Sequence, residues 1–232
     1  MKKLLFLVTM LAISLITIAQ QNGKTGEPRS FLVLHAGPSL PVEDFHSSVF
    51  TNTDAGFAKT GFNINLSYGY QLAENLGLVA NGFYNNNTLD NATIQRQMEN
   101  EMNLNAGELA GLKLDHWKWY GLTIGPAMMH NLNPKLAVDV RVMGGIANAN
   151  TPRIRFENEE LVSEDWAVTG VFQAGADTRI VLGNNLFVIL NAEYTYMKPK
   201  FHVTSNIQET VAESVKQKIS VVNVTAGLGI RF

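Results

Sequence analysis

Residues 220–232 read SVVNVTAGLGIRF, and this stretch decides the fold. Its apolar positions recur at every second residue, as Val222, Val224, Ala226, Leu228, Ile230 and Phe232. The residues between them are polar, charged or glycine, namely Asn223, Thr225, Gly227, Gly229 and Arg231. Successive side chains of a β-strand point to opposite faces, so the stretch predicts a strand with one continuous apolar face.

Seven other segments share this character. Together with the last one, they predict strands at residues 31–38, 60–71, 76–85, 116–129, 136–147, 166–181, 186–197 and 220–232. The alternation is clearest in 60–71, 136–147 and 186–197, where no charge interrupts the apolar face. Soluble strands average about 5–6 residues, whereas a tilted strand of about ten residues crosses a bilayer. The length of these segments therefore favours strands that span a membrane.

The connections between the predicted strands alternate in length. Long ones cover residues 39–59, 86–115, 148–165 and 198–219, and short ones cover 72–75, 130–135 and 182–185. Short turns on one side and long loops on the other are typical of outer-membrane barrels, whereas a soluble ligand-binding barrel points its apolar residues inward. The sequence predicts an all-β fold: an eight-stranded antiparallel up-and-down transmembrane β-barrel with short periplasmic turns and long extracellular loops.

The first residues have the pattern of a signal peptide. Lys2 and Lys3 precede the mainly apolar stretch 4–18, and small residues follow at Thr17 and Ala19. We expect cleavage after Ala19, a short linker at 20–30 and the barrel at 31–232, in a protein exported to a bacterial outer membrane. An uncleaved membrane anchor is the alternative, but a spanning helix needs about 20 apolar residues.

Composition excludes several kinds of site. The chain has no cysteine, so disulfides and thiolate chemistry are excluded. Its formal net charge is -2 with no basic cluster that stands out, so we expect no nucleic-acid partner. The five histidines lack the short spacings of metal ligands, so we expect no metal and no other cofactor. His46 lies beside Ser47 and Ser48, but no nucleophile elbow surrounds them, and we expect no enzyme.

The inward faces carry polar and charged residues that we expect to form a structural network in the lumen. An eight-stranded barrel is only wide enough for its interior to be filled by side chains, and charges removed from water must be paired. The expected network comprises His35, Asp139, Arg141, Gln173, Asp177, Arg179, Asn191, Glu193 and Arg231. The alternative is a narrow path for ions or water.

Two further features concern the barrel ends. Aromatic residues near the strand ends predict interfacial girdles, with a sugar-binding patch as the alternative: Trp117, Trp119, Tyr120, Trp166, Tyr194 and Tyr196. The long connection after the third strand has loose helical spacing over 92–114, which predicts a short external helix.

Three local motifs resemble the outer-membrane β-barrel domain family, which includes PorT-like proteins and OmpA-like eight-stranded barrels. They are HAGPSLP at 35–41 followed by Asp44-Phe45, GLTIGP at 121–126 and TAGLGIRF at 225–232. The resemblance implies an outer-membrane location and assembly by the barrel assembly machinery, with the terminal aromatic Phe232 as the recognition signal. It implies no particular role, since the family is functionally mixed.

Two classes of function remain open. The first is a structural or interaction barrel whose partners are outer-membrane lipid and an unknown extracellular or periplasmic protein. The second is a small pore or a component of transport or secretion. A hydrolase acting on outer-membrane lipid is a distant third alternative.

Overall fold

The computed structural model describes residues 29–157, 159–203 and 213–232. The predicted signal peptide, its cleavage after Ala19 and nearly all of the linker at 20–30 lie outside these described residues. Within the described part of the chain, no helix combines the length and the apolar character needed to cross a membrane.

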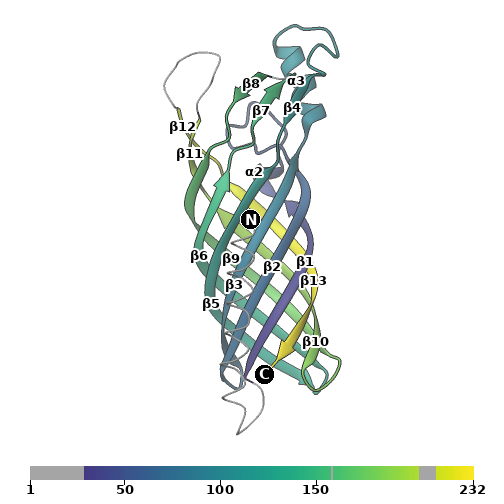
Figure 1. Ribbon diagram of the computed structural model, residues 1–232, viewed down its shortest axis with the longest axis vertical. Coiled ribbons are helices and arrows are strands. Elements are labelled where there is room, and N and C mark those ends of the chain that lie inside the picture. Colours follow the sequence, from purple (N-terminus) through teal and green to yellow (C-terminus); the bar gives the residue numbers. More distant parts are fainter. Residues whose placement is uncertain (1–28, 158, 204–212) are drawn as a thin grey trace.

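Eight long strands form a closed barrel, as the alternation predicted (Figure 1). They are β1 (Ser30–Pro41), β2 (Ala58–Ala73), β3 (Leu76–Leu89), β5 (Trp117–Asn133), β6 (Leu136–Asn150), β9 (Trp166–Val181), β10 (Leu186–Met197) and β13 (Ile219–Arg231). Every neighbouring pair is antiparallel, and β1 closes the barrel by pairing with β13. The prediction of an eight-stranded antiparallel up-and-down barrel is confirmed.

The short connections and the C-terminus gather at one end of the barrel, which we call the turn end, and the long connections form a head at the other (Figure 1). Several strands continue beyond their predicted bounds. β1 ends at Pro41, not at 38, because Ser39 and Pro41 still pair with Asn223 and Val221 of β13. Such extensions carry polar residues beyond the alternating stretch, so the apolar pattern does not mark them.

The head contains secondary structure of its own. Its elements are α2 (Glu43–His46), α3 (Asn91–Glu101), β4 (Leu112–Leu114), β7 (Ile154–Phe156), β8 (Glu159–Val162), β11 (Lys200–Val203) and β12 (Glu213–Lys216). The helix expected over 92–114 ends at Glu101, because Leu112 and its neighbours pair with β7 as a strand instead. Ile94, Leu112 and Leu114 form a small buried core under α3 and this sheet.

The outer wall of the barrel is an exposed apolar belt. Val168 is 74% exposed, Met128 69%, Leu122 67% and Leu228 58%. Each of these residues alternates with a buried or half-buried neighbour that faces the lumen. An apolar surface of this extent is far larger than the patches that soluble monomers expose, so the belt is suited to lipid.

The N-terminus of α3 provides a local prediction. Asp90 accepts a hydrogen bond from the backbone nitrogen of Thr93 at 3.3 Å and lies 2.8 Å from the ammonium group of Lys59. Partial burial would raise the pKa of Asp90, but the hydrogen bonds from Lys59 and Thr93 outweigh it and lower the pKa. Asp90→Ala should therefore destabilise the helix by about 1 kcal/mol, seen as faster amide hydrogen exchange over residues 91–101.

The effect of pH follows from the direction of that shift. A lowered folded-state pKa stabilises the helix above the unfolded value of about 3.9, and this contribution is lost as the pH falls through the folded value. Exchange over 91–101 in the wild type should therefore accelerate in acid below about pH 4 relative to the Asp90→Ala variant. Equal exchange in the two proteins at neutral pH would contradict the capping role of Asp90.

Candidate functional site: the lumen and the head

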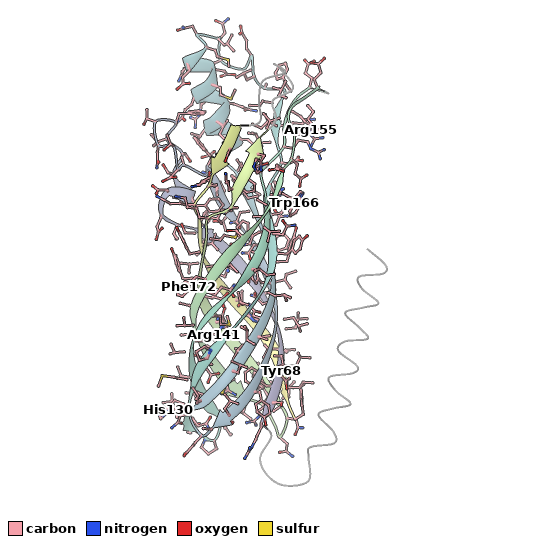
Figure 2. The ribbon with its side chains drawn as sticks, turned by 90° about the vertical axis from the view of Figure 1, so that its left-hand side faces the viewer. Tyr68, His130, Arg141, Arg155, Trp166 and Phe172 are labelled. Carbon is pink, nitrogen blue, oxygen red and sulfur yellow. The ribbon has the colours of Figure 1, made fainter. Side chains whose placement is uncertain are left out.

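An ionic cluster fills the middle of the lumen. Arg141 of β6 lies 2.6 Å from Asp177 of β9 and 2.8 Å from Glu193 of β10. The three residues are at most 4% exposed, and Figure 2 shows Arg141 inside the barrel. One guanidinium group therefore pairs with carboxylates from both of the next two strands, and Asn191 also donates to Asp177 at 2.6 Å.

A second ion pair lies next to it, towards the turn end. The Nε atom of Arg179 is 2.6 Å from Asp139, which is directly opposite Asp177 in the register of β6 and β9. Two acids on facing positions would repel each other, and the two arginines offset that repulsion. The guanidinium group of Arg179 also lies 5.3 Å from the ring centre of Phe31.

Two glycines make room for aromatic rings in the part of the lumen near Arg179. Phe31 is paired with Gly69 across β1 and β2, and Phe187 is paired with Gly229 across β10 and β13. A Cβ atom at Gly69 would come within 2.0 Å of the Phe31 ring, and one at Gly229 within 2.2 Å of the Phe187 ring. The two rings meet edge to face at 6.1 Å between centres and belong to one buried apolar cluster.

Neutral polar side chains occupy the lumen between the ionic cluster and the head. His35 contacts Thr225 at 2.7 Å and Ser67 at 3.1 Å through its two ring nitrogens. Gln173 accepts a hydrogen bond from Thr123 at 2.6 Å. Buried asparagines of β2 and β3 also belong to this network and were not predicted, although the period of two along these strands indicates them: Asn63, Asn65, Asn81, Asn85 and Asn87.

All of the predicted network residues except one lie buried in the lumen. The buried ones are His35, Asp139, Arg141, Gln173, Asp177, Arg179, Asn191 and Glu193. Arg231 does not join them: it is half-buried at the turn end and donates to the backbone oxygen of Asn184 at 3.3 Å. Its strand ends there, so its side chain reaches the barrel mouth and not the cluster. Phe232 follows it, and its backbone nitrogen and oxygen both bond to Ser30, at 2.9 and 3.0 Å.

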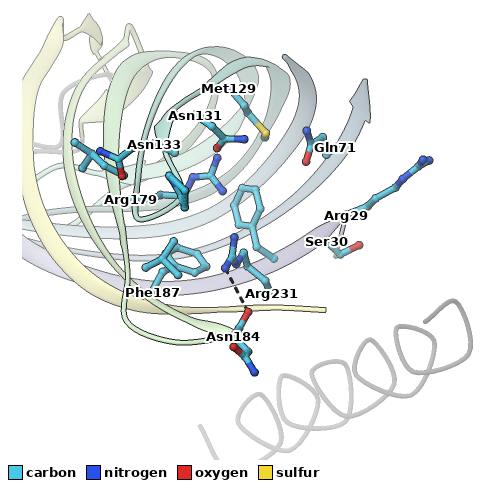
Figure 3. A pocket seen from close by; sticks show the side chains of 15 residues that line it. Arg29, Ser30, Gln71, Met129, Asn131, Asn133, Arg179, Asn184, Phe187 and Arg231 are labelled. Atoms are coloured by element: carbon cyan, nitrogen blue, oxygen red, sulfur yellow. Dashed lines mark hydrogen bonds between the residues drawn. The ribbon is translucent and has the colours of Figure 1, made fainter. Parts of the chain in front are cut away.

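A cavity of about 380 Å³ opens at this mouth. Figure 3 shows Arg179, Arg231 and Phe187 among the residues that line it. It ends in the lumen at the level of Arg179 and Phe31, and the side chains beyond that level are buried: His35 is 1% exposed and Arg141 2%. The cavity is therefore a vestibule that the ionic cluster closes.

Apolar rings close the lumen at the head end. Trp119, Phe45 and Phe201 are each 0% exposed, and the Phe45 ring meets those of Trp117 and Trp119 edge to face, at 5.6 and 5.9 Å between centres. We call this group, with Trp117, the aromatic plug. Its Phe45 comes from α2, in the first long loop, and Phe201 from β11, in the last.

The plug corrects the predicted girdle in part. Trp117 and Trp119 point into the barrel, because the odd-numbered positions at this end of β5 face inward. Tyr120 and Trp166 are exposed on the outer wall, 5.8 Å apart between ring centres. Phe62 and Tyr84 form a second outer pair, with ring centres 5.8 Å apart; the alternation alone could have separated the inner from the outer aromatics.

The head has an apolar cavity of its own, of about 450 Å³. Residues from three loops line it, among them Phe50, Met98, Met102, Trp117 and Ile154. Phe50 is 38% exposed and Met102 58%, so part of this lining is open to solvent. An apolar cavity on a surface away from the lipid belt is the kind of feature that binding sites have.

His46, Ser47 and Ser48, which are neighbours in the sequence, are not among the residues that line the apolar cavity of the head. No group of three acidic, histidine or cysteine side chains that could hold a metal ion occurs among residues 29–157, 159–203 and 213–232. His46 contacts the backbone oxygen of Ala58 at 3.4 Å, and the backbone oxygen of Ser48 accepts a hydrogen bond from Gln97 at 2.9 Å.

No protein-family model matches the chain, and no curated protein matches it. Solved structures do. The attachment invasion locus protein Ail of Yersinia pestis is 15% identical, with a TM-score of 0.51 over 89% of this chain and 100% of that one. Neisserial surface protein A is 10% identical, with a TM-score of 0.51 over 90% and 100%.

A major outer membrane protein from Thermus thermophilus is 12% identical, with a TM-score of 0.51 over 88% of this chain and 99% of that one. At such identities these likenesses show the fold alone. They support the broader part of the resemblance, an eight-stranded barrel of the outer-membrane type, and they do not bear on the PorT-like part.

Proposed function

We propose that this chain is an integral barrel of a bacterial outer membrane, with a closed lumen and an extracellular head that binds a partner. The exposed apolar belt and the fold of outer-membrane barrels support this location. In this orientation the turn end is periplasmic and the head is extracellular. Outer-membrane lipid surrounds the belt, and the barrel assembly machinery would recognise the chain through Phe232. The proposed role is not enzymatic.

The observation that carries the proposal is the filling of the lumen at two levels. The ionic cluster around Arg141 blocks the middle, and the aromatic plug around Trp119 blocks the head end. A pore would need a continuous polar path through both of these levels. The vestibule at the turn end is a feature that would favour a passage, but it ends at Arg179.

The head supports the binding role. Its loops do more than cover the lumen, because they form a sheet and a helix around a small core of their own. The apolar cavity beside α3 presents Phe50, Met98 and Met102, and methionine adapts its shape to different partners. We infer that the partner inserts an apolar group into this cavity.

The experiment that tests closure is recording in planar lipid bilayers. The purified mature barrel should insert and give no steady discrete conductance. A variant in which residues 91–111 are replaced by a short glycine-serine linker should insert equally well and stay closed, because the ionic cluster and the plug do not include that segment. Steady unitary currents from the wild type would reject the closed barrel in favour of a pore.

A further inference from the structure

One row of outward-facing side chains continues from the barrel wall into the stem of the β11–β12 hairpin. On β10, Leu190 is exposed, and Tyr194 and Tyr196 follow it on the same face. The alternation then continues through Lys198 and Lys200, which are both exposed. Along this row the side chains change from apolar to aromatic to cationic as the strand leaves the belt. Figure 1 shows β11 and β12 beyond the end of the barrel wall.

A third lysine joins the row through the register of the hairpin. Lys200 of β11 lies directly opposite Lys216 of β12, which is also exposed. Like charges at facing positions destabilise a strand pair, so this arrangement has a cost in the isolated protein. We call Lys198, Lys200 and Lys216 the lysine patch. Lys218, two residues further on, differs from it, since its ammonium group lies 2.5 Å from Asp54.

The nearby acids whose side chains the structure describes do not neutralise the lysine patch. Glu43 accepts a hydrogen bond from the Tyr194 hydroxyl at 3.2 Å, and Asp165 accepts one from the backbone nitrogen of His202 at 2.7 Å. In the described portions of the chain, no salt bridge involves a lysine of the patch. The patch therefore presents three cationic groups without an internal counterion among those residues.

The height of the patch suits a lipid headgroup. Tyrosines at barrel ends mark the boundary between acyl chains and headgroups. A tilted strand advances about 5 Å along the membrane normal for every two residues. Lys198 and Lys200 follow Tyr196 at such steps, so their ammonium groups lie at the level of the headgroups, where the anionic groups of lipids are phosphates.

We propose that the lysine patch binds the phosphate groups of an outer-leaflet lipid. Phosphate would supply the counterion that the described side chains do not provide here, and it would relieve the repulsion between Lys200 and Lys216. The inference rests on the outer-membrane placement proposed above. It adds a defined lipid contact on one side of the barrel, next to the β11–β12 hairpin.

The test compares matched double variants of the mature barrel in phosphatidylcholine nanodiscs, titrated with diphosphorylated lipid A. Lys200→Gln with Lys216→Gln should bind roughly 25-fold more weakly than wild type, because each lysine near an anionic surface contributes roughly fivefold. Lys113→Gln with Lys135→Gln removes the same charge from exposed sites in the head and in a turn, and should bind like wild type. The wild-type affinity should also fall with added salt and with monophosphorylated lipid A.

A single variant separates binding from structure. Lys200→Glu turns the facing pair into opposite charges, so the barrel should be at least as resistant to heat as wild type while its lipid affinity falls. Wild-type affinity in Lys200→Gln with Lys216→Gln, or an equal loss in the control pair, would overturn the proposal. If the protein inserts into phosphatidylcholine alone but shows no preference for phosphate, only the lipid site fails. If it does not insert into any bilayer, the proposed location fails as well.

Discussion

Replacing Arg141 by alanine should destabilise the folded barrel by about 3–5 kcal/mol, the usual effect of removing one partner of a buried ion pair. Arg141 holds Asp177 at 2.6 Å and Glu193 at 2.8 Å, and its removal leaves these two carboxylates close together, away from water and without their shared counterion. The measurement is the free energy of unfolding in urea, with the protein in lipid vesicles and followed by tryptophan fluorescence.

A rescue variant separates the charge from the packing. Arg141→Met combined with Asp177→Asn and Glu193→Gln removes all three charges while keeping similar side-chain volumes. It should recover most of the stability that Arg141→Ala loses, because well-packed neutral groups often replace a buried ionic cluster without loss. If Arg141→Ala unfolds at the same urea concentration as wild type, the cluster is not a structural element of the lumen.

Trp119→Ala should also destabilise the barrel by about 3–5 kcal/mol, through the cavity that it leaves in the aromatic plug. Trp119 is 0% exposed, and its ring lies 5.9 Å from that of Phe45, so the site has few ways to collapse. The same urea titration measures the loss. The variant should remain non-conducting in planar bilayers, because the ionic cluster still blocks the middle of the lumen.

The neighbouring residue is the control. Tyr120→Ala removes an aromatic ring one position along β5, but this ring is 48% exposed on the outer wall. Its effect should be well below that of Trp119→Ala. Equal losses for the two variants would mean that Trp119 and Tyr120 do not face opposite sides of the wall.

The strand count and the facing of each strand followed from local sequence. The period of two is a property of each strand alone. The even-numbered residues from Val222 to Phe232 could therefore be assigned to the outer face, and the odd-numbered residues from Asn223 to Arg231 to the inner face, without knowledge of any neighbour. The lengths of the connections can also be read from the sequence alone, and their alternation placed the short turns at one end of the barrel and the long loops at the other. This is why the closed eight-stranded barrel could be predicted.

Applied strictly, the same rule would also have placed Trp117 and Trp119 correctly. Aromatic residues near strand ends are common in girdles, but the odd-numbered positions of both tryptophans on β5 place them on the face opposite to that of Tyr120. The buried asparagines of β2 and β3 extend the predicted network, which already included the amides Gln173 and Asn191. Their period of two along the strands places them on the inner face by the same rule.

The depth of each side chain along the barrel depended on the tertiary structure. Arg141 and Arg231 both lie on inward faces, but only the first lies in the ionic cluster, because the closure of β1 on β13 sets how far each strand is shifted against the next. The pairings of Arg141 with Glu193 and of Arg179 with Asp139 depend on that shift between strands. So does the meeting of Phe45 and Phe201 at the plug, since they come from loops more than a hundred residues apart.

The sequence by itself therefore determined the number of barrel strands, the inner and outer faces, and the side of the barrel that carries the long loops. These properties depend on the geometry of single strands and on the lengths of connections. Only the tertiary structure decided which charges pair, what closes each end of the lumen, and which lysines face each other at the head. These depend on register and on contacts between segments far apart in the chain, which no local pattern records.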